Sequence, residues 1–213
     1  AMARACVSTY ASRSPGDGVR ASAMSALMTH LPAEEAVTYR EQLVSDLQRH
    51  GANEASLIEA KSNLGRAYAG AGRHDDALAI WREVHAMNVA LRGPEHEETL
   101  YSAGNLAHSL VATGHHDEAK TLLRDKVLPT ARRVLPPEND VIVSGDSILA
   151  RAIYQADDAS VEDLREAVAL LEAVCTTSRR VYGAEHPQVA ICESHLDAAQ
   201  AKLAAAVAAA AAP

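Results

Sequence analysis

Apolar residues recur at helical spacing in the middle of the chain, and glycine or proline interrupts the pattern at regular intervals. Leu57, Leu64 and Tyr68 fall on one face of a helix that ends at a pair of nearby glycines. A second apolar stripe runs from Ala77 to Leu91 and ends before a Gly-Pro pair. This segment therefore predicts two consecutive helices joined by a short turn.

The two-helix pattern repeats with a period of 42 residues. The stretch "SNLGRAYAGAGRHDDALAIW", residues 62–81, aligns with "GNLAHSLVATGHHDEAKTLL", residues 104–123. Weaker copies precede them at residues 38–54 and follow them at residues 137–153. A repeat of this length indicates stacked helix pairs that share a continuous core, so we expect an all-α fold of about four repeats.

The alignment divides the chain into six segments. We expect a leader, a degenerate N-terminal helix pair, three repeats, and a C-terminal capping helix with an alanine-rich tail, the third repeat carrying an insertion near residues 157–161. Their ranges are 1–16, 17–51, 52–93, 94–136, 137–183 and 184–213. Pro129 lies inside the second helix of the repeat at 94–136, where we expect it to kink or break the helix.

The repeats resemble the tetratricopeptide repeat (TPR), in its 42-residue, kinesin light chain-like form. The matching stretches are "NLGRAYAGAGRHDDAL", "NLAHSLVATGHHDEA", "LRGPEHEETL" and "VYGAEHPQVA", and the resemblance is strongest over residues 52–136. The resemblance implies a right-handed superhelical array of antiparallel helix pairs. It also implies a concave groove, lined by the first helix of each pair, that holds a peptide or protein partner.

Composition narrows the classes of partner. The chain is 48% apolar but contains no phenylalanine, and its formal net charge is -8. An acidic chain without a basic face is a poor ligand for nucleic acid. No uninterrupted apolar run is long enough to span a membrane.

The three cysteines, Cys6, Cys175 and Cys192, show neither metal-ligand spacing nor an even disulfide framework. We therefore expect a reducing, cytoplasmic location. Cys175 and Cys192 lie on consecutive predicted helices and are able to approach each other, but packing as buried thiols is favoured. An organelle is the alternative location, because the N-terminal leader is rich in arginine and serine.

Three stretches suggest chemistry but lack the required spacing. His96 stands among three glutamates in "RGPEHEETL", yet Leu100 occupies the place of the second histidine of H-E-x-x-H. The stretch recurs at each predicted helix junction, so we interpret it as a turn followed by a helix start. "TGHHDEA" and His108 assemble no tetrahedral ligand set. "SGDSILA" around Ser147 lacks the G-x-S-x-G pattern. We predict no catalytic residue, no metal site and no cofactor.

Exposed polar positions on the predicted first helices are the candidate binding residues. They are Asn63, Arg66, Tyr101, Asn105, His108, Ser147, Arg151 and Tyr154. By resemblance, Asn63 and Asn105 occupy positions where an asparagine faces the bound chain, and an amide both donates to and accepts from a peptide backbone. Arg66 and Arg151 are suited to pair with acidic groups of a partner.

The function that we predict is a non-catalytic scaffold or adaptor that binds a peptide or protein. One alternative is a fixed structural subunit of a larger, organellar complex, with the leader and the alanine-rich tail held by other chains. A metal-dependent enzyme that uses the histidines is the less favoured alternative, because the ligand spacing is absent.

Overall fold

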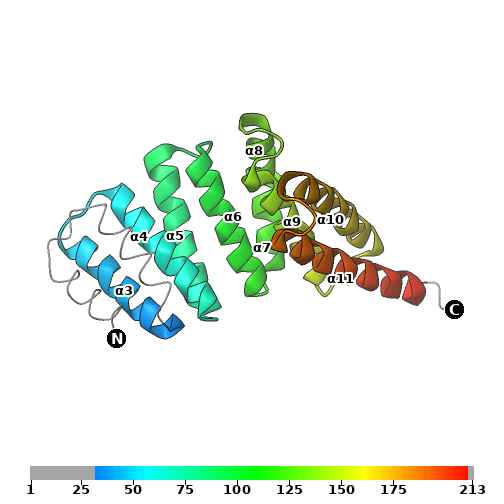
Figure 1. The fold of residues 1–213 in the computed structure, drawn as a ribbon, viewed down its shortest axis with the longest axis horizontal. Coiled ribbons are helices and arrows are strands. Elements are labelled where there is room, and N and C mark those ends of the chain that lie inside the picture. Colours follow the sequence, from blue (N-terminus) through cyan, green and yellow to red (C-terminus); the bar gives the residue numbers. More distant parts are fainter. Residues whose placement is uncertain (1–31, 211–213) are drawn as a thin grey trace. The chain divides into compact units, whose positions relative to one another are not determined.

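The computed structural model describes residues 32–210 (Figure 1), and within this range every regular element is a helix. The all-α fold class is confirmed. The chain divides after Gly93 into an N-terminal unit and a C-terminal unit, which are described separately. The leader at 1–16 and the first part of the degenerate pair at 17–51 lie outside the described residues.

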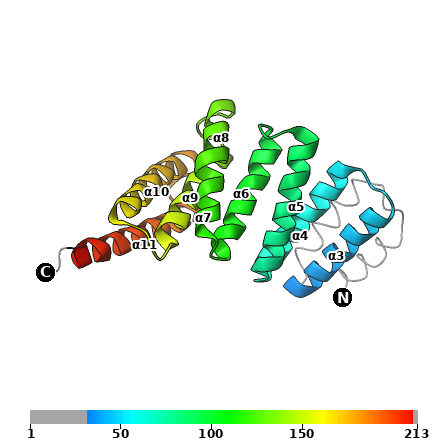
Figure 2. The same ribbon diagram turned by 180° about the vertical axis from the view of Figure 1, so that it is seen from behind.

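Over residues 32–93, the N-terminal unit contains three helices, α3 (Ala33–Arg49), α4 (Glu54–Gly70) and α5 (His74–Arg92). They lie side by side and alternate in direction (Figures 1 and 2). The Asn53 side chain caps α4 by accepting a hydrogen bond from the Ser56 backbone N–H at 2.8 Å. Gly72, with a φ of 76°, supplies the left-handed residue of the turn into α5.

The core of this unit depends on one close approach between α4 and α5. Gly65 presents no side chain to the indole of Trp81, which is only 3% exposed. Lys61 is buried on the same helix and forms an ion pair with Glu83 of α5. The predicted stripe of α5 is buried at its start and exposed near its end, where Leu91 is 43% exposed.

As far as it is described, over residues 94–210, the C-terminal unit contains two complete helix pairs and a final helix. The first pair is α6 (Glu97–Ala112) with a second helix built from three consecutive segments, α7 (His116–Thr121), η1 (Leu122–Val127) and α8 (Leu128–Val134). The second pair is α9 (Asp140–Gln155) with α10 (Val161–Tyr182), and α11 (Pro187–Ala210) follows. The fully buried side chains Leu123, Leu164 and Leu171 join these helices into one core.

Pro129 changes the helix without ending it. The segment before it, η1, is a π-helical turn, and α8 then starts at Leu128 with Pro129 in its first turn. The wider turn removes the need for the hydrogen bond that proline is unable to donate. The sequence predicts a kink or a break at Pro129; the helical segments instead follow one another without a break, and the hydrogen bonds before Pro129 take the π-helical pattern.

The insertion expected near residues 157–161 forms the loop between α9 and α10. Its last residue, Ser160, starts α10 with a capping box, in which Ser160 and Asp163 exchange hydrogen bonds between side chains and backbone. These hydrogen bonds lower the pKa of Asp163. The first residue of the loop, Ala156, accepts a hydrogen bond from Lys202 of α11 at 2.6 Å.

Candidate partner-binding face

The "RGPEHEETL" stretch is a turn and a helix cap. Gly93 has a φ of 86° and ends α5, and the Nδ1 atom of His96 accepts a hydrogen bond from the backbone N–H of Glu98 at 3.2 Å. Asn139 and His186 make the equivalent bonds at the starts of α9 and α11. At these three junctions, the equivalent position therefore supplies the side-chain acceptor that a helix N-terminus needs.

The two adjacent histidines of "TGHHDEA" lie at the start of a helix. His115 bonds to Thr113 in the turn before α7, and His116 opens α7. Within residues 32–210, no group of three or more histidine, cysteine or acidic residues is arranged to hold a metal ion.

In the N-terminal unit, two candidate residues form a pair on α4. Arg66 donates a hydrogen bond to the Oδ1 atom of Asn63 at 2.6 Å. Arg66 is exposed and Asn63 is half-buried. The Asn63 amide nitrogen makes no hydrogen bond to the described residues, so it remains able to donate to a bound backbone.

In the C-terminal unit, the remaining candidates lie on α6 and α9. Tyr101 and His108 are exposed, while Asn105 is half-buried and donates to the backbone carbonyl of Tyr101 at 3.3 Å. We call the surface formed by α6, α9 and α11 the first-helix face, because each of these helices is the first of a pair or stands in that position.

Arg151, Tyr154 and His195 form a cluster on this face. The Tyr154 hydroxyl and the His195 Nδ1 atom lie 3.0 Å apart, which links α9 to α11. Tyr154 is only 7% exposed, so the expectation that it is an exposed binding residue is wrong. Its side chain instead fills the space between α9 and α11 and holds His195.

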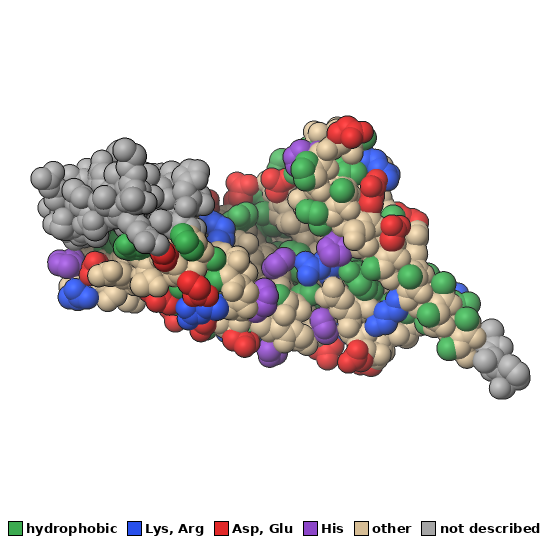
Figure 3. Space-filling model, turned by 60° about the horizontal axis from the view of Figure 1, so that its bottom comes forward, with side chains coloured by type: hydrophobic (Ala, Val, Ile, Leu, Met, Phe, Trp, Pro, Cys, Tyr) green, Lys and Arg blue, Asp and Glu red, His purple; other side chains and the backbone are tan. Residues whose placement is uncertain are grey.

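The Arg151 guanidinium is half-buried without a carboxylate partner among the described residues. Its Nε atom is buried and makes no hydrogen bond. Burial lowers the pKa of Arg151, and burial together with the nearby Arg151 charge lowers the pKa of His195. Figure 3 shows exposed histidine side chains, together with Lys and Arg side chains, without identifying individual residues.

Sequence reasoning did not find His195 as a member of this cluster. A signal was available, because aligning "VYGAEHPQVA" with "LRGPEHEETL" places His195 at the position of Asn105. The weak similarity of α11 to the other first helices concealed this correspondence.

A cavity of about 300 Å³ opens between α9, α10 and α11. Ser147, a predicted candidate, lines it together with the buried Ser178. At the ends of the helices, the Tyr182 hydroxyl donates a hydrogen bond to Asp140, which raises the pKa of Tyr182. The remaining residues that line the cavity are Val143, Ser144, Val174, His186, Gln188, Ile191 and Cys192.

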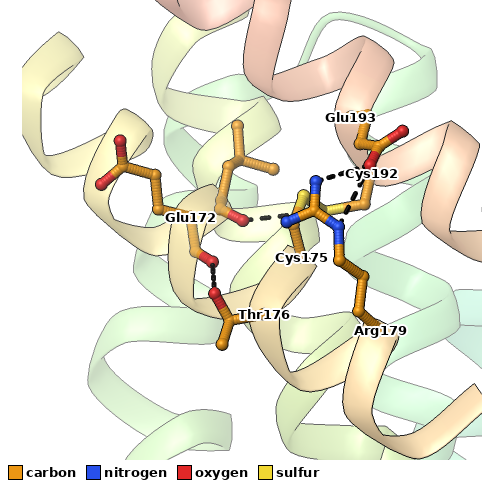
Figure 4. The surroundings of a disulfide bond; sticks show 7 residues. Glu172, Cys175, Thr176, Arg179, Cys192 and Glu193 are labelled. Carbon is orange, nitrogen blue, oxygen red and sulfur yellow. Dashed lines mark hydrogen bonds and ion pairs between the residues drawn. A yellow bond between two sulfur atoms is a disulfide. The ribbon is translucent and has the colours of Figure 1, made fainter. Parts of the chain in front are cut away.

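Cys175 and Cys192 form a disulfide bond between α10 and α11 (Figure 4), with their Cα atoms 5.6 Å apart. The expectation of two separate buried thiols is wrong, and the reducing location loses the support that it drew from unpaired cysteines. Arg179 crosses near the disulfide to bind Glu193, with its Nη2 atom 2.5 Å from the carboxylate. Sequence reasoning placed the two cysteines on consecutive helices but had no information on the register between them.

No helix within the described range combines the length and the apolar character that crossing a membrane requires.

Two family models for the tetratricopeptide repeat match the chain, one over residues 56–125 and one over residues 159–188. No curated protein sequence matches it. Two solved structures of a putative kinesin light chain from Podosopora anserina, with nearly identical TPR-like repeats, are similar. The structure of a point variant is 28% identical, covers 83% of this chain and 85% of its own, and has a TM-score of 0.61. The other structure is 27% identical, covers 85% and 90%, and has a TM-score of 0.59.

The structure of BtubC (BKLC) from P. vanneervenii shares the fold, with a TM-score of 0.70 at 15% identity over 97% of this chain and 85% of that one. The capped helix pairs agree with these comparisons, because the family models and the two kinesin light chain-like structures all describe tetratricopeptide repeats. Residues 56–125 and 159–188 carry tetratricopeptide repeats, and the chain is similar to kinesin light chain-like structures built from such repeats.

Proposed function

We propose that this protein is a non-catalytic adaptor that binds an extended segment of a protein partner on the first-helix face of its C-terminal unit. Tetratricopeptide repeats generally serve as scaffolds for protein–protein interaction. The finer proposal, that the first-helix face holds the partner, rests on the side chains of that face.

The observation that carries the proposal is the unpaired guanidinium of Arg151. A half-buried charge without a counter-ion lowers the stability of the fold. Burial removes the water molecules that hydrogen-bond to the guanidinium, and no protein group takes their place at its Nε atom. A carboxylate from a partner replaces that water and forms charge-assisted hydrogen bonds with the guanidinium. Arg132, Arg133 and Arg179 of the same unit already have carboxylate partners within the chain.

The test is a comparative affinity purification with the full chain and two arginine variants. Arg151→Gln removes the proposed contact, and Arg165→Gln is the matched control, because Arg165 is exposed and pairs with Glu162 in its own helix. We expect a set of proteins to be recovered with the wild-type chain and with Arg165→Gln but not with Arg151→Gln. Equal recovery by all three forms would overturn the proposal for this face, provided that circular dichroism shows all three to be folded.

The exposed end of α11 supports a second candidate function, a fixed structural subunit. Ala199 is the last buried residue of α11, and Val207 beyond it is 43% exposed on an alanine-rich helix. An apolar helix end of this kind is suited to pack against another chain. Limited proteolysis of the native assembly tests this function: rapid cleavage within residues 200–210 would argue against it.

A further inference from the structure

The cavity between α9, α10 and α11 contains hydrogen-bonding groups that the fold leaves unused. The Ser178 side chain is only 1% exposed, lines the cavity, and has no hydrogen-bond partner among the described residues. The half-buried Ser147 hydroxyl lines the same cavity and likewise makes no bond in this part of the chain. Buried hydroxyls are usually satisfied, so the buried Ser178 hydroxyl and the half-buried Ser147 hydroxyl both have hydrogen-bonding capacity left for a polar ligand in this cavity.

The charge at the mouth of the cavity is negative. Asp140 accepts a hydrogen bond from the Tyr182 hydroxyl but pairs with no cation of the described chain. The neighbouring arginines are occupied, Arg179 by Glu193 and Arg180 by Glu138. A carboxylate with free acceptor capacity and no internal counter-ion favours a positively charged ligand.

Part of the remaining wall is apolar, although Ser144, His186 and Gln188 also line the cavity. Val143 of α9, Val174 of α10 and Ile191 of α11 line the cavity, and Ile191 is 51% exposed at its edge. Its volume of about 300 Å³ lies at the lower end of the range for ligand sites, which suits one side chain better than a larger molecule. A lysine fits this combination, because its methylene stem covers apolar surface while its ammonium group stays at a polar edge.

The dimensions of α9 agree with this ligand. Asp140 and Ser147 are seven residues apart, or about 10 Å along the helix axis. A lysine stem spans roughly 6 Å from Cα to Nζ when extended. A lysine with its ammonium at Asp140 therefore places its own peptide group near the serine hydroxyls.

We infer that this cavity is a lysine-binding pocket, in which Asp140 pairs with the ammonium group of a partner's lysine and Ser147 and Ser178 bind the adjacent backbone. This inference deepens the proposed adaptor function and rests on it. The Cys175–Cys192 disulfide joins two walls of the pocket, since α10 and α11 each contribute one of its cysteines.

The test uses three small probes and the isotope-labelled full chain, observed by amide chemical shifts. The probes are the N-acetyl methylamides of lysine, norleucine and glutamate, which share a backbone and differ in the charge of the side chain. We expect the lysine probe alone to shift the amides of Ser144, Ser178 and Ile191. Equal shifts with norleucine would overturn the inference, as would a response to glutamate in its place.

Variants identify the group that selects the charge. Asp140→Asn keeps the shape of the side chain but removes its charge, and we expect it to weaken lysine binding about tenfold or more, because hydrogen bonds to charged groups are the stronger ones. Asp158→Asn, on the exposed loop after α9, is the matched control and should bind as the wild type does. Undiminished binding to Asp140→Asn contradicts the assignment.

A second variant guards against a change in the fold. Ser178→Ala removes only the buried hydroxyl that lines the cavity. It should weaken binding of the lysine probe by a smaller factor than Asp140→Asn does, while leaving the helical circular dichroism unchanged. Failure of the lysine pocket can be distinguished from failure of the proposed adaptor function. Loss of partners from Arg151→Gln with no binding of the lysine probe would leave the adaptor function standing and remove the pocket.

Discussion

Gly65 of α4 lies against the indole of Trp81 in α5, so closely that a Cβ atom at Gly65 would stand 2.9 Å from the Cε2 atom of the ring. The indole is buried and has little room to move. We predict that Gly65→Ala destabilises the N-terminal unit, because overpacking costs about 1–3 kcal/mol and outweighs the gain of up to about 1 kcal/mol from replacing a helical glycine.

Gly104→Ala is the matched control for this prediction. Gly104 also lies inside a helix, but a Cβ atom there meets nothing within 4 Å. It should therefore stabilise α6 by up to about 1 kcal/mol through helix propensity alone. Urea unfolding of both variants measures the difference, and a Gly65→Ala protein as stable as Gly104→Ala would show that the contact between α4 and α5 is not tight.

The Cys175–Cys192 disulfide predicts a specific thiol count. Of the three cysteines, we expect one free thiol in the denatured, unreduced protein and three after treatment with a dithiol reductant. Three free thiols before reduction would contradict the bond. The measurement is a colorimetric thiol titration in denaturant, with the Cys6→Ala variant as a control that should show no free thiol before reduction and two after it.

The same disulfide should stabilise the terminal helix. The two cysteines are 17 residues apart, and a bond that closes a loop of this size contributes roughly 3 kcal/mol. We predict faster amide hydrogen exchange in α11 for the Cys175→Ala/Cys192→Ala variant than for the wild type. Exchange in α4 of the N-terminal unit serves as an internal reference and should stay unchanged.

His96 should behave as a helix cap in mutagenesis. Replacement by alanine removes the acceptor for the Glu98 N–H and should cost about 1 kcal/mol. His96→Asn should be neutral or stabilising, because asparagine already fills this role at position 139. Thermal unfolding monitored by circular dichroism compares the two variants. An equal loss for asparagine and alanine would mean that His96 acts through something other than its cap.

The features that sequence reasoning found are local ones. Helix bounds and junctions depend on a few neighbouring residues, so the glycines that end the helices and the recurring junction around His96 were visible as a repeating pattern. The features that it missed depend on packing between helices. The register that joins Cys175 to Cys192 and the burial of Tyr154 each require knowing which helix faces which, information that the spacing of residues along one chain does not contain.

The contact between Tyr154 and His195 predicts how stability changes with pH. Burial and the nearby Arg151 charge lower the pKa of His195 from its ordinary value of 6.5, so the folded state resists protonation more than the unfolded state does. The unfolded chain therefore binds the additional proton first, and stability is lost as the pH falls below about 6.5. We predict that the free energy of unfolding decreases between pH 7.5 and pH 5, and that His195→Gln reduces this decrease. His74→Gln, at an exposed position in the N-terminal unit, is the control and should keep the wild-type slope. A His195→Gln slope equal to that of the wild type would show that this histidine does not contribute to the pH dependence.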